Sequence, residues 1–474
     1  MFKAFNQSRP DAPTQARPAA PSVPPPTTAE PARKPVAPTP APPHNPLARP
    51  AGSQTALKSA LHELVLDKLN LTVLDKVSRD DLRREIANLA ADHLKSQNQL
   101  MPGPAFKQLI DELLHEVLGL GPLEPLLADP SVSDILVNGT DTVFVERAGL
   151  LERADISFRD ERHLLRIIDK IVSSVGRRID ESQPWVDARL EDGSRVNAII
   201  RPCAIDGPSL SIRKFSKTPL RMDKLLEHGA LSRPAALFLE AAVKGRMNCL
   251  ISGGTGSGKT TMLNAMSAFI DPRQRMVTIE DAAELQLQQD HVVRLETRPS
   301  NAEGKGAITQ RDLLVNALRM RPDRIMVGEV RGAEAFDMLQ AMNTGHDGSM
   351  TTIHANTARD AVSRLEQMVT MVGNDFPMQA VRYQIAAGLQ IVLQLNRLSD
   401  GSRRVMSISE IVGIEGDVIM MQDIFVFKKM GVDDEGRVRG RMMATGVRPK
   451  CFEALMASGV PLAADAFAPG EKAA

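Results

Sequence analysis

A run of glycines followed by lysine and threonine is the part of the sequence best suited to chemistry. Residues 253–260 read Gly-Gly-Thr-Gly-Ser-Gly-Lys-Thr, which fits the phosphate-binding pattern G-x-x-x-x-G-K-[ST]. The glycines let the backbone turn its N–H groups toward phosphate oxygens, and a helix starting here adds the positive end of its dipole. Lys259 would reach the β- and γ-phosphates, and the Thr260 hydroxyl would bind Mg²⁺. The expected nucleotide-binding residues are Gly254, Thr255, Gly256, Ser257, Gly258, Lys259, Thr260 and Thr261.

Three carboxylates follow the ends of apolar strands near this motif. The strand expected over residues 324–327 leads into Glu329, which could hold Mg²⁺ through water or polarise an attacking water molecule. A glutamate exposed at a strand end is the alternative. The segment 278–284, Thr-Ile-Glu-Asp-Ala-Ala-Glu, adds Glu280 and Glu284 at the end of another expected strand. These strand ends would leave a spare carboxylate, which water activation requires.

Histidines and arginines supply further candidates. His346 and His354 flank a glycine-rich turn and a short strand, where they could sense a γ-phosphate through hydrogen bonds, although a lone histidine is usually structural. Arg195, Arg201 and Arg213 lie on or beside expected strands. They either form a solvated strand face or offer positive charge to phosphates, as an arginine does in many nucleotide hydrolases.

The motif lies in an α/β domain expected over residues 221–474, where strands and helices alternate. An apolar strand at 247–251 precedes the glycines and a helix at 261–269 follows them. Further strands are expected at 276–280, 324–327 and 350–353, with helices at 308–320, 333–342 and 358–371. This order predicts a mostly parallel sheet with helices on both faces and the glycines at the carboxyl end of their strand. Antiparallel strands after residue 391 should extend the sheet.

Four other regions are expected before this domain. Residues 1–55 form a disordered tail rich in proline and alanine, because they carry too little apolar surface to fold. Residues 56–120 form a helical bundle with a capping box at 78–81 and a left-handed stop at Gly119. Residues 121–215 form an α+β domain with an antiparallel sheet and a hairpin at Asp192-Gly193. Residues 216–220 form a hinge linker.

Composition excludes several classes of protein. Lys+Arg and Asp+Glu both number 58, so the net charge of zero gives no indication of nucleic-acid binding. Trp185, Tyr383 and 14 Phe provide few aromatic side chains for stacking on bases. Three isolated cysteines predict neither a metal cluster nor a disulfide framework. No signal peptide or long apolar run is visible, so a cytoplasmic protein is expected.

Four sequence boxes together resemble a known family. GGTGSGKTT, TIEDAAE, RPDRIMVGEVRG and TGHDGSMTTIHAN are similar to the Walker A, Asp, Walker B and His boxes of the type II/type IV secretion ATPase superfamily. Within this superfamily the sequence resembles the CpaF branch, the motors of tight-adherence (Flp/Tad) pili. The resemblance is carried by the segment AMNTGHDGSMTTIHANTARDAVSRLE and by RVNAIIRP and SIRKF before it. The similarity covers roughly residues 57–445. Ala282 stands where the pilus-retraction branch usually has proline, which favours the CpaF branch.

The resemblance implies a fold, an activity and partners. The fold would be a RecA-like P-loop ATPase domain preceded by a PAS-like α+β domain. The protein would be a homohexameric ATP hydrolase that uses ATP and Mg²⁺. It would associate peripherally with the cytoplasmic face of the inner membrane, through pilus platform proteins. Two alternatives remain: a conjugation or effector-secretion ATPase of the same superfamily, and a nucleotide-gated scaffold with little turnover.

The resemblance also assigns roles to particular residues. Lys259 and Thr260 would contact phosphate and Mg²⁺, and Glu329 would be the Walker B glutamate. Glu284 matches the catalytic glutamate of the Asp box best, with Glu280 as its rival. The remaining expected contributors to the site are His346, His354, Arg195, Arg201 and Arg213.

Overall fold

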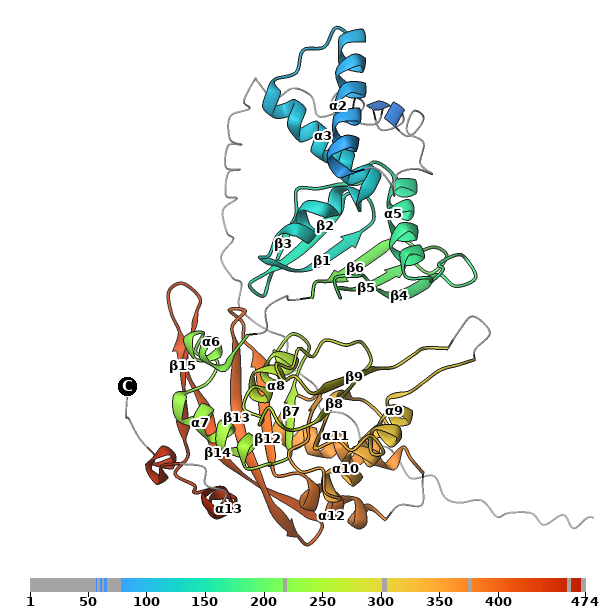
Figure 1. The fold of residues 1–474 in the computed structure, drawn as a ribbon. Helices are drawn as coiled ribbons and strands as arrows, with labels where there is room; N and C mark the ends of the chain where they lie inside the picture. The colour runs from blue at the N-terminus through green and yellow to red at the C-terminus, as the bar shows by residue number, and fades with distance from the viewer. Residues whose placement is uncertain are drawn as a thin grey trace, which may run out of the picture. The chain divides into compact units, whose positions relative to one another are not determined.

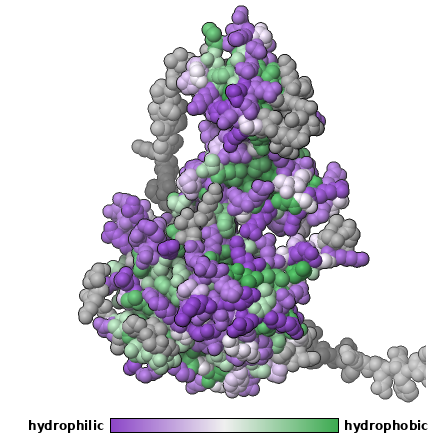
Figure 2. All heavy atoms as spheres, viewed as in Figure 1, coloured by the Kyte–Doolittle hydropathy of each residue, from purple (hydrophilic) through white to green (hydrophobic). Residues whose placement is uncertain are grey.

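The computed structural model describes residues 78–215, 220–300, 305–373, 377–457 and 462–469, together with positions 57, 60, 61, 64 and 65. The expected tail, residues 1–55, lies outside the described residues, as do residues 216–219 of the expected linker and most of positions 56–77. Among the described helices, none is long and apolar enough to cross a membrane. The face drawn in Figure 2 is mostly hydrophilic, with hydrophobic residues scattered across it.

Two helices near the N-terminus of the described chain pack on each other. They are α2 (Arg79–Ser96) and α3 (Gly103–Leu118), and their apolar stripes share one core with Leu61 and Val65. Ser78 caps α2, because its hydroxyl oxygen accepts the backbone N–H of Asp81 at 3.2 Å. The apolar stripes of the two helices therefore form a common core.

The expected left-handed stop at Gly119 is wrong. Gly119 has φ −102°, in the extended region. The end of α3 is instead capped by the ammonium of Lys170, which donates to the carbonyls of Val117, Leu118 and Gly119. A Cβ at this position would lie 2.3 Å from a carboxylate oxygen of Glu124, so a larger residue would require the Glu124 side chain to shift.

A six-stranded antiparallel sheet follows, in the order β3-β2-β1-β6-β5-β4 (Figure 1). Short helices η2 (Gly121–Leu123) and α4 (Glu124–Ala128) lead into it, and α5 (Glu161–Ser174) buries its apolar face against it. The hairpin expected at Asp192-Gly193 is confirmed, and Gly193 takes φ +91°. Edge strand β3 was missed because all four of its residues are exposed, so it lacks the expected alternation. The strands are β1 (Val132–Asn138), β2 (Thr142–Arg147), β3 (Leu150–Arg153), β4 (Trp185–Arg189), β5 (Arg195–Ile199) and β6 (Ser209–Arg213).

A nine-stranded mixed sheet forms the second half of the chain, in the order β15-β14-β13-β12-β7-β11-β10-β8-β9. Strands from β12 to β9 pair in parallel, and β13, β14 and β15 extend the sheet antiparallel, as expected. The strands are β7 (Cys249–Gly253), β8 (Met276–Glu280), β9 (Val292–Glu296), β10 (Arg324–Val330), β11 (Met350–Ile353), β12 (Ile391–Arg397), β13 (Arg403–Glu415), β14 (Val418–Val432) and β15 (Val438–Ala444).

Helices cover both faces of this sheet (Figure 1). Cys249 and Ile251 of β7 join the core formed with α6, α7, α8 and α13, whereas Leu250 between them joins the core formed with α9 to α12. Such a strand, buried on both faces, is continuously apolar. The helices are α6 (Met222–Glu227), α7 (Arg233–Lys244), α8 (Lys259–Ser267), α9 (Gln310–Ala317), α10 (Glu334–Asn343), α11 (Ala358–Thr370), α12 (Met378–Gly388) and α13 (Phe452–Ala457), with a final turn η3 (Ala464–Phe467).

Candidate nucleotide site

The glycine-rich motif connects the carboxyl end of β7 to the start of α8. Gly256 has φ +70° and Gly258 has φ +96°, conformations that residues with a Cβ rarely adopt. Among the described residues, the backbone N–H of Ser257 finds an acceptor, but those of Gly256, Gly258, Lys259 and Thr260 find none. Unpaired donors at a helix N-terminus are suited to bind an anion. The loop therefore has the geometry of a phosphate cradle.

A cavity of about 750 Å³ opens over this loop and is lined by residues from both sheets. It brings together most of the side chains that the sequence singled out. Those lining it are Gly254 to Thr261, Arg195, Arg213, Glu280, Glu284, Glu329 and His354.

Two expected site residues, His346 and Arg201, do not line the cavity. His346 and His354 are separated by β11, so His354 follows its carboxyl end and lines the cavity, whereas His346 precedes its amino end. The carbonyl of His346 accepts a hydrogen bond from the Ser349 hydroxyl at 2.7 Å. Arg201 lies beyond the end of β5, where its Nε donates to Glu161 on α5 at 3.2 Å.

Arg195 and Arg213 reach the cavity from the six-stranded sheet. They are directly opposite each other on β5 and β6, so their side chains leave the same face. Arg195 pairs with Glu284 at 2.7 Å, and Arg213 pairs with Asp134 at 3.0 Å. Burial alone would lower the pKa of Arg213, but the hydrogen bond and charge of Asp134 outweigh it and the pKa is raised. Both side chains are cations paired with carboxylates beside the glycine-rich loop.

The two rival glutamates of the Asp box have different surroundings. Glu280 ends β8 and is 3% exposed, and its Oε2 accepts the backbone N–H groups of Glu284 and Leu285 at 2.7 and 2.8 Å. Burial raises the pKa of Glu280 to about 7, although these two hydrogen bonds oppose the change. Gly328 leaves room for it, since a Cβ there would lie 2.9 Å from Cγ of Glu280. Glu284, in contrast, directs its carboxylate to Arg195 at the cavity.

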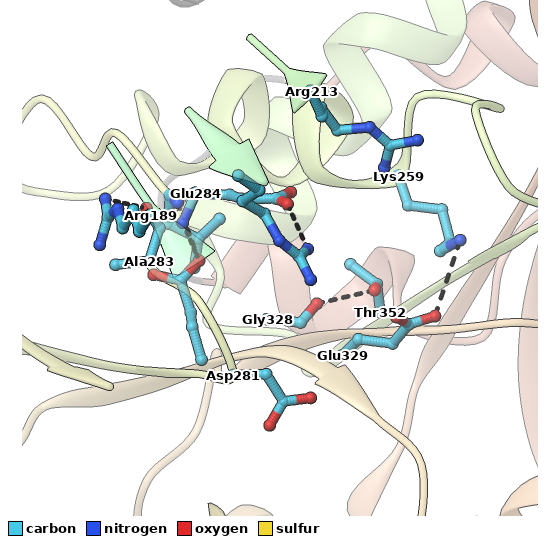
Figure 3. A network of polar contacts seen from close by, with 12 residues as sticks. Arg189, Arg213, Lys259, Asp281, Ala283, Glu284, Gly328, Glu329 and Thr352 are labelled. Carbon is cyan, nitrogen blue, oxygen red and sulfur yellow. Dashed lines mark hydrogen bonds and ion pairs between the residues drawn. The ribbon is translucent and has the colours of Figure 1, made fainter. Parts of the chain in front are cut away.

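Glu329 lies beside Lys259 of the glycine-rich motif (Figure 3). Its Oε1 is 3.8 Å from Nζ of Lys259, and its Oε2 accepts from Arg331 at 2.6 Å. Lys259 also donates to the carbonyls of Gly253 and Gly254 at 3.0 and 3.2 Å. Burial lowers the pKa of Lys259, and the nearby charge of Glu329 offsets this effect only in part. A bound phosphate would therefore favour the charged form of Lys259.

Sequence reasoning missed four arginines that line the cavity, Arg331, Arg364, Arg397 and Arg403. Arg397 ends β12 and Arg403 begins β13, and both pair with Glu146 of β2, at 3.2 and 3.4 Å. Arg403 Nε also donates to the carbonyl of Gly256 at 2.9 Å. For Arg397 and Arg403, the available signal was their position on either side of the turn expected at Asp400-Gly401.

The oxygen atoms at the cavity fit Mg²⁺ held jointly with phosphates. Thr260, Glu284 and Glu329 offer hydroxyl and carboxylate oxygens, which Mg²⁺ prefers. Among the described residues, no group of three or more His, Cys, Asp or Glu side chains could hold a metal alone. A magnesium ion bound here would therefore need phosphate and water ligands.

Sequence comparisons place the chain among secretion proteins. The family described as "Type II/IV secretion system protein" matches residues 116–449. A putative conjugal transfer protein of Mycobacterium tuberculosis is 40% identical over 309 residues, which cover 64% of this chain and 87% of the relative. The type IV secretion system protein VirB11 of Brucella suis is 32% identical over 317 residues, which cover 61% of this chain and 88% of VirB11.

Solved structures also resemble the chain, with low TM-scores. The VirB11 ATPase of Brucella suis, in complex with sulphate, is 30% identical and has a TM-score of 0.33. The match covers 60% of this chain and 94% of the VirB11 chain. The pilus retraction motor PilT with bound ADP is 22% identical, with a TM-score of 0.44, 60% of this chain covered and 80% of that chain covered. Membership therefore rests on the sequence matches, which span most of the chain. The chain belongs to the type II/IV secretion system ATPase superfamily.

Proposed function

We propose that this protein hydrolyses ATP with Mg²⁺ and converts the reaction into relative motion of its two sheet-containing domains. The observation that supports this most strongly is the single cavity in which the phosphate cradle, Glu284, Glu329 and two arginines of the other sheet converge. Transfer of a phosphoryl group requires mainly positioning and stabilisation of charge, and this set of residues supplies both.

Each side chain has a role in this proposal. The loop N–H groups and Lys259 bind phosphate oxygens, while Thr260 and Glu329 hold Mg²⁺, Glu329 through water. Glu284 orients the attacking water and accepts its proton, and Arg195 and Arg213 stabilise charge that develops on the phosphates. Bound ATP with Mg²⁺ would supply the transferable phosphoryl group. When Arg195 turns from Glu284 toward a phosphate, the carboxylate is left free to act as a base.

Glu280 is better suited to positioning than to proton transfer. Its Oε2 is already occupied by two backbone N–H groups of the segment that carries Glu284. Glu284 has no such backbone contacts to its carboxylate among the described residues. We therefore assign the role of general base to Glu284.

The motor action is part of the same proposal. Arg195 and Arg213 belong to the six-stranded sheet and the cradle to the nine-stranded sheet, so phosphate binding would draw the two domains together. The linker expected at 216–220 would act as the hinge. In a homohexameric ring, subunits with different nucleotides would close and open in turn and displace a membrane partner.

The proposed cellular role is assembly, and possible retraction, of a tight-adherence (Flp/Tad) pilus. The CpaF-like wording of the boxes supports this role, which would place the ring at the cytoplasmic face of the inner membrane against pilus platform proteins. The second candidate is conjugation or effector secretion, favoured by the names of the Mycobacterium and Brucella relatives. Deleting the gene and scoring surface pili by electron microscopy, alongside plasmid transfer and effector export, separates the candidates. Loss of pili alone supports the pilus role.

An ATPase assay tests the enzymatic proposal. Purified Lys259→Ala and Glu284→Gln proteins should lose at least about 100-fold in turnover, because each lacks a group required in the transition state. The control is Arg178→Ala, since Arg178 is 85% exposed and pairs with Asp180 away from the cavity. Melting temperatures should stay close to that of the parent. Parent-like turnover in either variant would refute that residue's role, and a parent that binds ATP without hydrolysing it would indicate the scaffold alternative.

A further inference from the structure

The segment that carries Glu284 is fixed by hydrogen bonds to its backbone. The N–H of Ala283 donates to Oε2 of Glu296 at 3.0 Å, and the carbonyl of Ala283 accepts from Nη2 of Arg189 at 2.8 Å. The next N–H, of Glu284 itself, donates to Glu280 at 2.7 Å. The backbone is thus held on both sides of the residue that faces the cavity.

Arg189 is the contact that comes from the other sheet. It lies on β4, an edge strand of the six-stranded sheet, whereas Glu296 lies on β9, an edge strand of the nine-stranded sheet. Its second nitrogen, Nη1, donates to Oε2 of Glu296 at 2.6 Å. One planar guanidinium therefore bridges a carboxylate and the carbonyl of Ala283, which the fork geometry of arginine allows. Figure 3 shows Arg189 beside Ala283 and Glu284.

Arg189 is not itself part of the cavity. Neither of the two cavities found at this place, of about 750 and 320 Å³, is lined by it, although both are lined by Glu284 and Arg195. Its side chain is about one third exposed. Any effect of Arg189 on the reaction must therefore act through the residues it holds.

We propose that Arg189 is a positioning residue that places the Glu284 carboxylate for reaction only while the α+β domain is docked on the nucleotide domain. The inference rests on the proposed role of Glu284 as the base. Opening of the domains would withdraw the Arg189 guanidinium from the carbonyl of Ala283. The peptide before Glu284 would then lose its hydrogen bond to the six-stranded sheet. Domain closure would thus switch on hydrolysis through the backbone, in addition to bringing Arg195 and Arg213 to the phosphates.

A purely electrostatic role in domain docking is the competing explanation, and two variants distinguish it. Arg189→Ala removes both the ion pair and the hydrogen bond to Ala283. Glu296→Gln removes the charge of the pair, yet its amide oxygen can still accept the N–H of Ala283, and Arg189 can still reach the carbonyl. If positioning matters, Arg189→Ala is damaging and Glu296→Gln is mild.

The experiment measures steady-state ATP hydrolysis and ADP affinity of the full-length protein. Arg189→Ala should lower kcat about 10-fold, as expected when a reacting group is misplaced, with KM and the Kd for ADP within about 2-fold of the parent. Glu296→Gln and the control Arg178→Ala should keep kcat within about 2-fold. Melting temperature and oligomeric state, measured for each variant, show whether the fold is retained.

A cycle with Glu284→Gln completes the test. In single-turnover reactions with excess protein, Arg189→Ala should reduce the rate about 10-fold in the parent but less than about 2-fold in the Glu284→Gln background, because the two residues act through one group. Equal losses in both backgrounds, or a loss in Glu296→Gln as large as in Arg189→Ala, would overturn the positioning role. If Glu284→Gln alone retains parent turnover, the proposed base is wrong, which is a separate result from a failure of Arg189.

Discussion

Replacing Glu280 by glutamine tests whether this buried carboxyl group costs stability at neutral pH. Glu280 is 3% exposed, and its Oε1 has no hydrogen-bond partner among the described residues. Burial raises its pKa from 4.5 to about 7, with Glu284 adding to the increase and Arg294 and two backbone N–H groups opposing it. The folded protein thus holds a proton on Glu280 over a pH range in which the unfolded chain has released it.

The sign of the pH effect follows from this difference. Below about pH 4.5 both states carry the proton, and Glu280 contributes no pH dependence. Between about pH 4.5 and 7 the folded state binds more protons, so the free energy of unfolding falls as pH rises. At 1.36 kcal/mol for each pH unit, the accumulated loss above pH 7 is about 3 kcal/mol. Glutamine cannot ionise, so Glu280→Gln should avoid that loss.

Calorimetry at pH 5, 6, 7 and 8 on the nucleotide-free protein measures the effect. Relative to the parent, the melting temperature of Glu280→Gln should rise by about 5 to 10 °C between pH 5 and pH 8, taking about 2 to 4 °C per kcal/mol for a domain of this size. The control is Glu453→Gln, which removes an exposed glutamate that pairs with Arg448 and should show no such gain. Parallel pH profiles for Glu280→Gln and the parent would refute the reasoning.

The same variant separates the two rival glutamates in catalysis. The amide oxygen of glutamine can accept the N–H groups of Glu284 and Leu285, so the segment should stay in place and most turnover should remain. Turnover as low as that of Glu284→Gln would instead make Glu280 the base.

Two further predictions concern structural contacts. Arg324→Met should lower stability by about 3 kcal/mol, seen as a lower melting temperature, because Arg324 is 1% exposed and its loss leaves the carbonyls of Val243 and Gly348 without this donor. Lys170→Ala should speed amide hydrogen exchange in the last turn of α3 about 5-fold, because an ammonium at a helix C-terminus contributes about 1 kcal/mol. Unchanged exchange there would show that the three carbonyl contacts of Lys170 add no stability.

Much of the nine-stranded sheet could be predicted because local sequence features identify its strands. The runs ending at Glu280 and Ile353 are buried on both faces, and the sequence alone places both strands at their observed bounds. Gly256 and Gly258 identify the loop because its positive φ angles need glycine. Strand β9 was missed because it is an edge strand with no fully buried residue.

Site membership was harder to predict than site chemistry. The His box places His346 and His354 eight positions apart, but β11 fills the space between them. At about 3.3 Å per residue, that four-residue strand alone separates its ends by about 10 Å. Arg201 fails for a related reason, since β5 ends at Ile199 before reaching it. Residues close in sequence were therefore assigned to one site although a strand end intervenes.

The converse limit applies to residues that are far apart in sequence. Arg397 and Arg403 are paired across the start of the β12–β13 hairpin, and Glu146 of the other sheet holds both while Arg403 also contacts the carbonyl of Gly256. No local pattern could link position 146 to position 403, because the contact of Glu146 with Arg403 depends on how one domain docks on the other. The cavity owes several of its charges to that docking. Substitutions at docking contacts such as Arg189 should therefore reduce turnover more than they reduce stability, since the cores on each side of the contact stay intact.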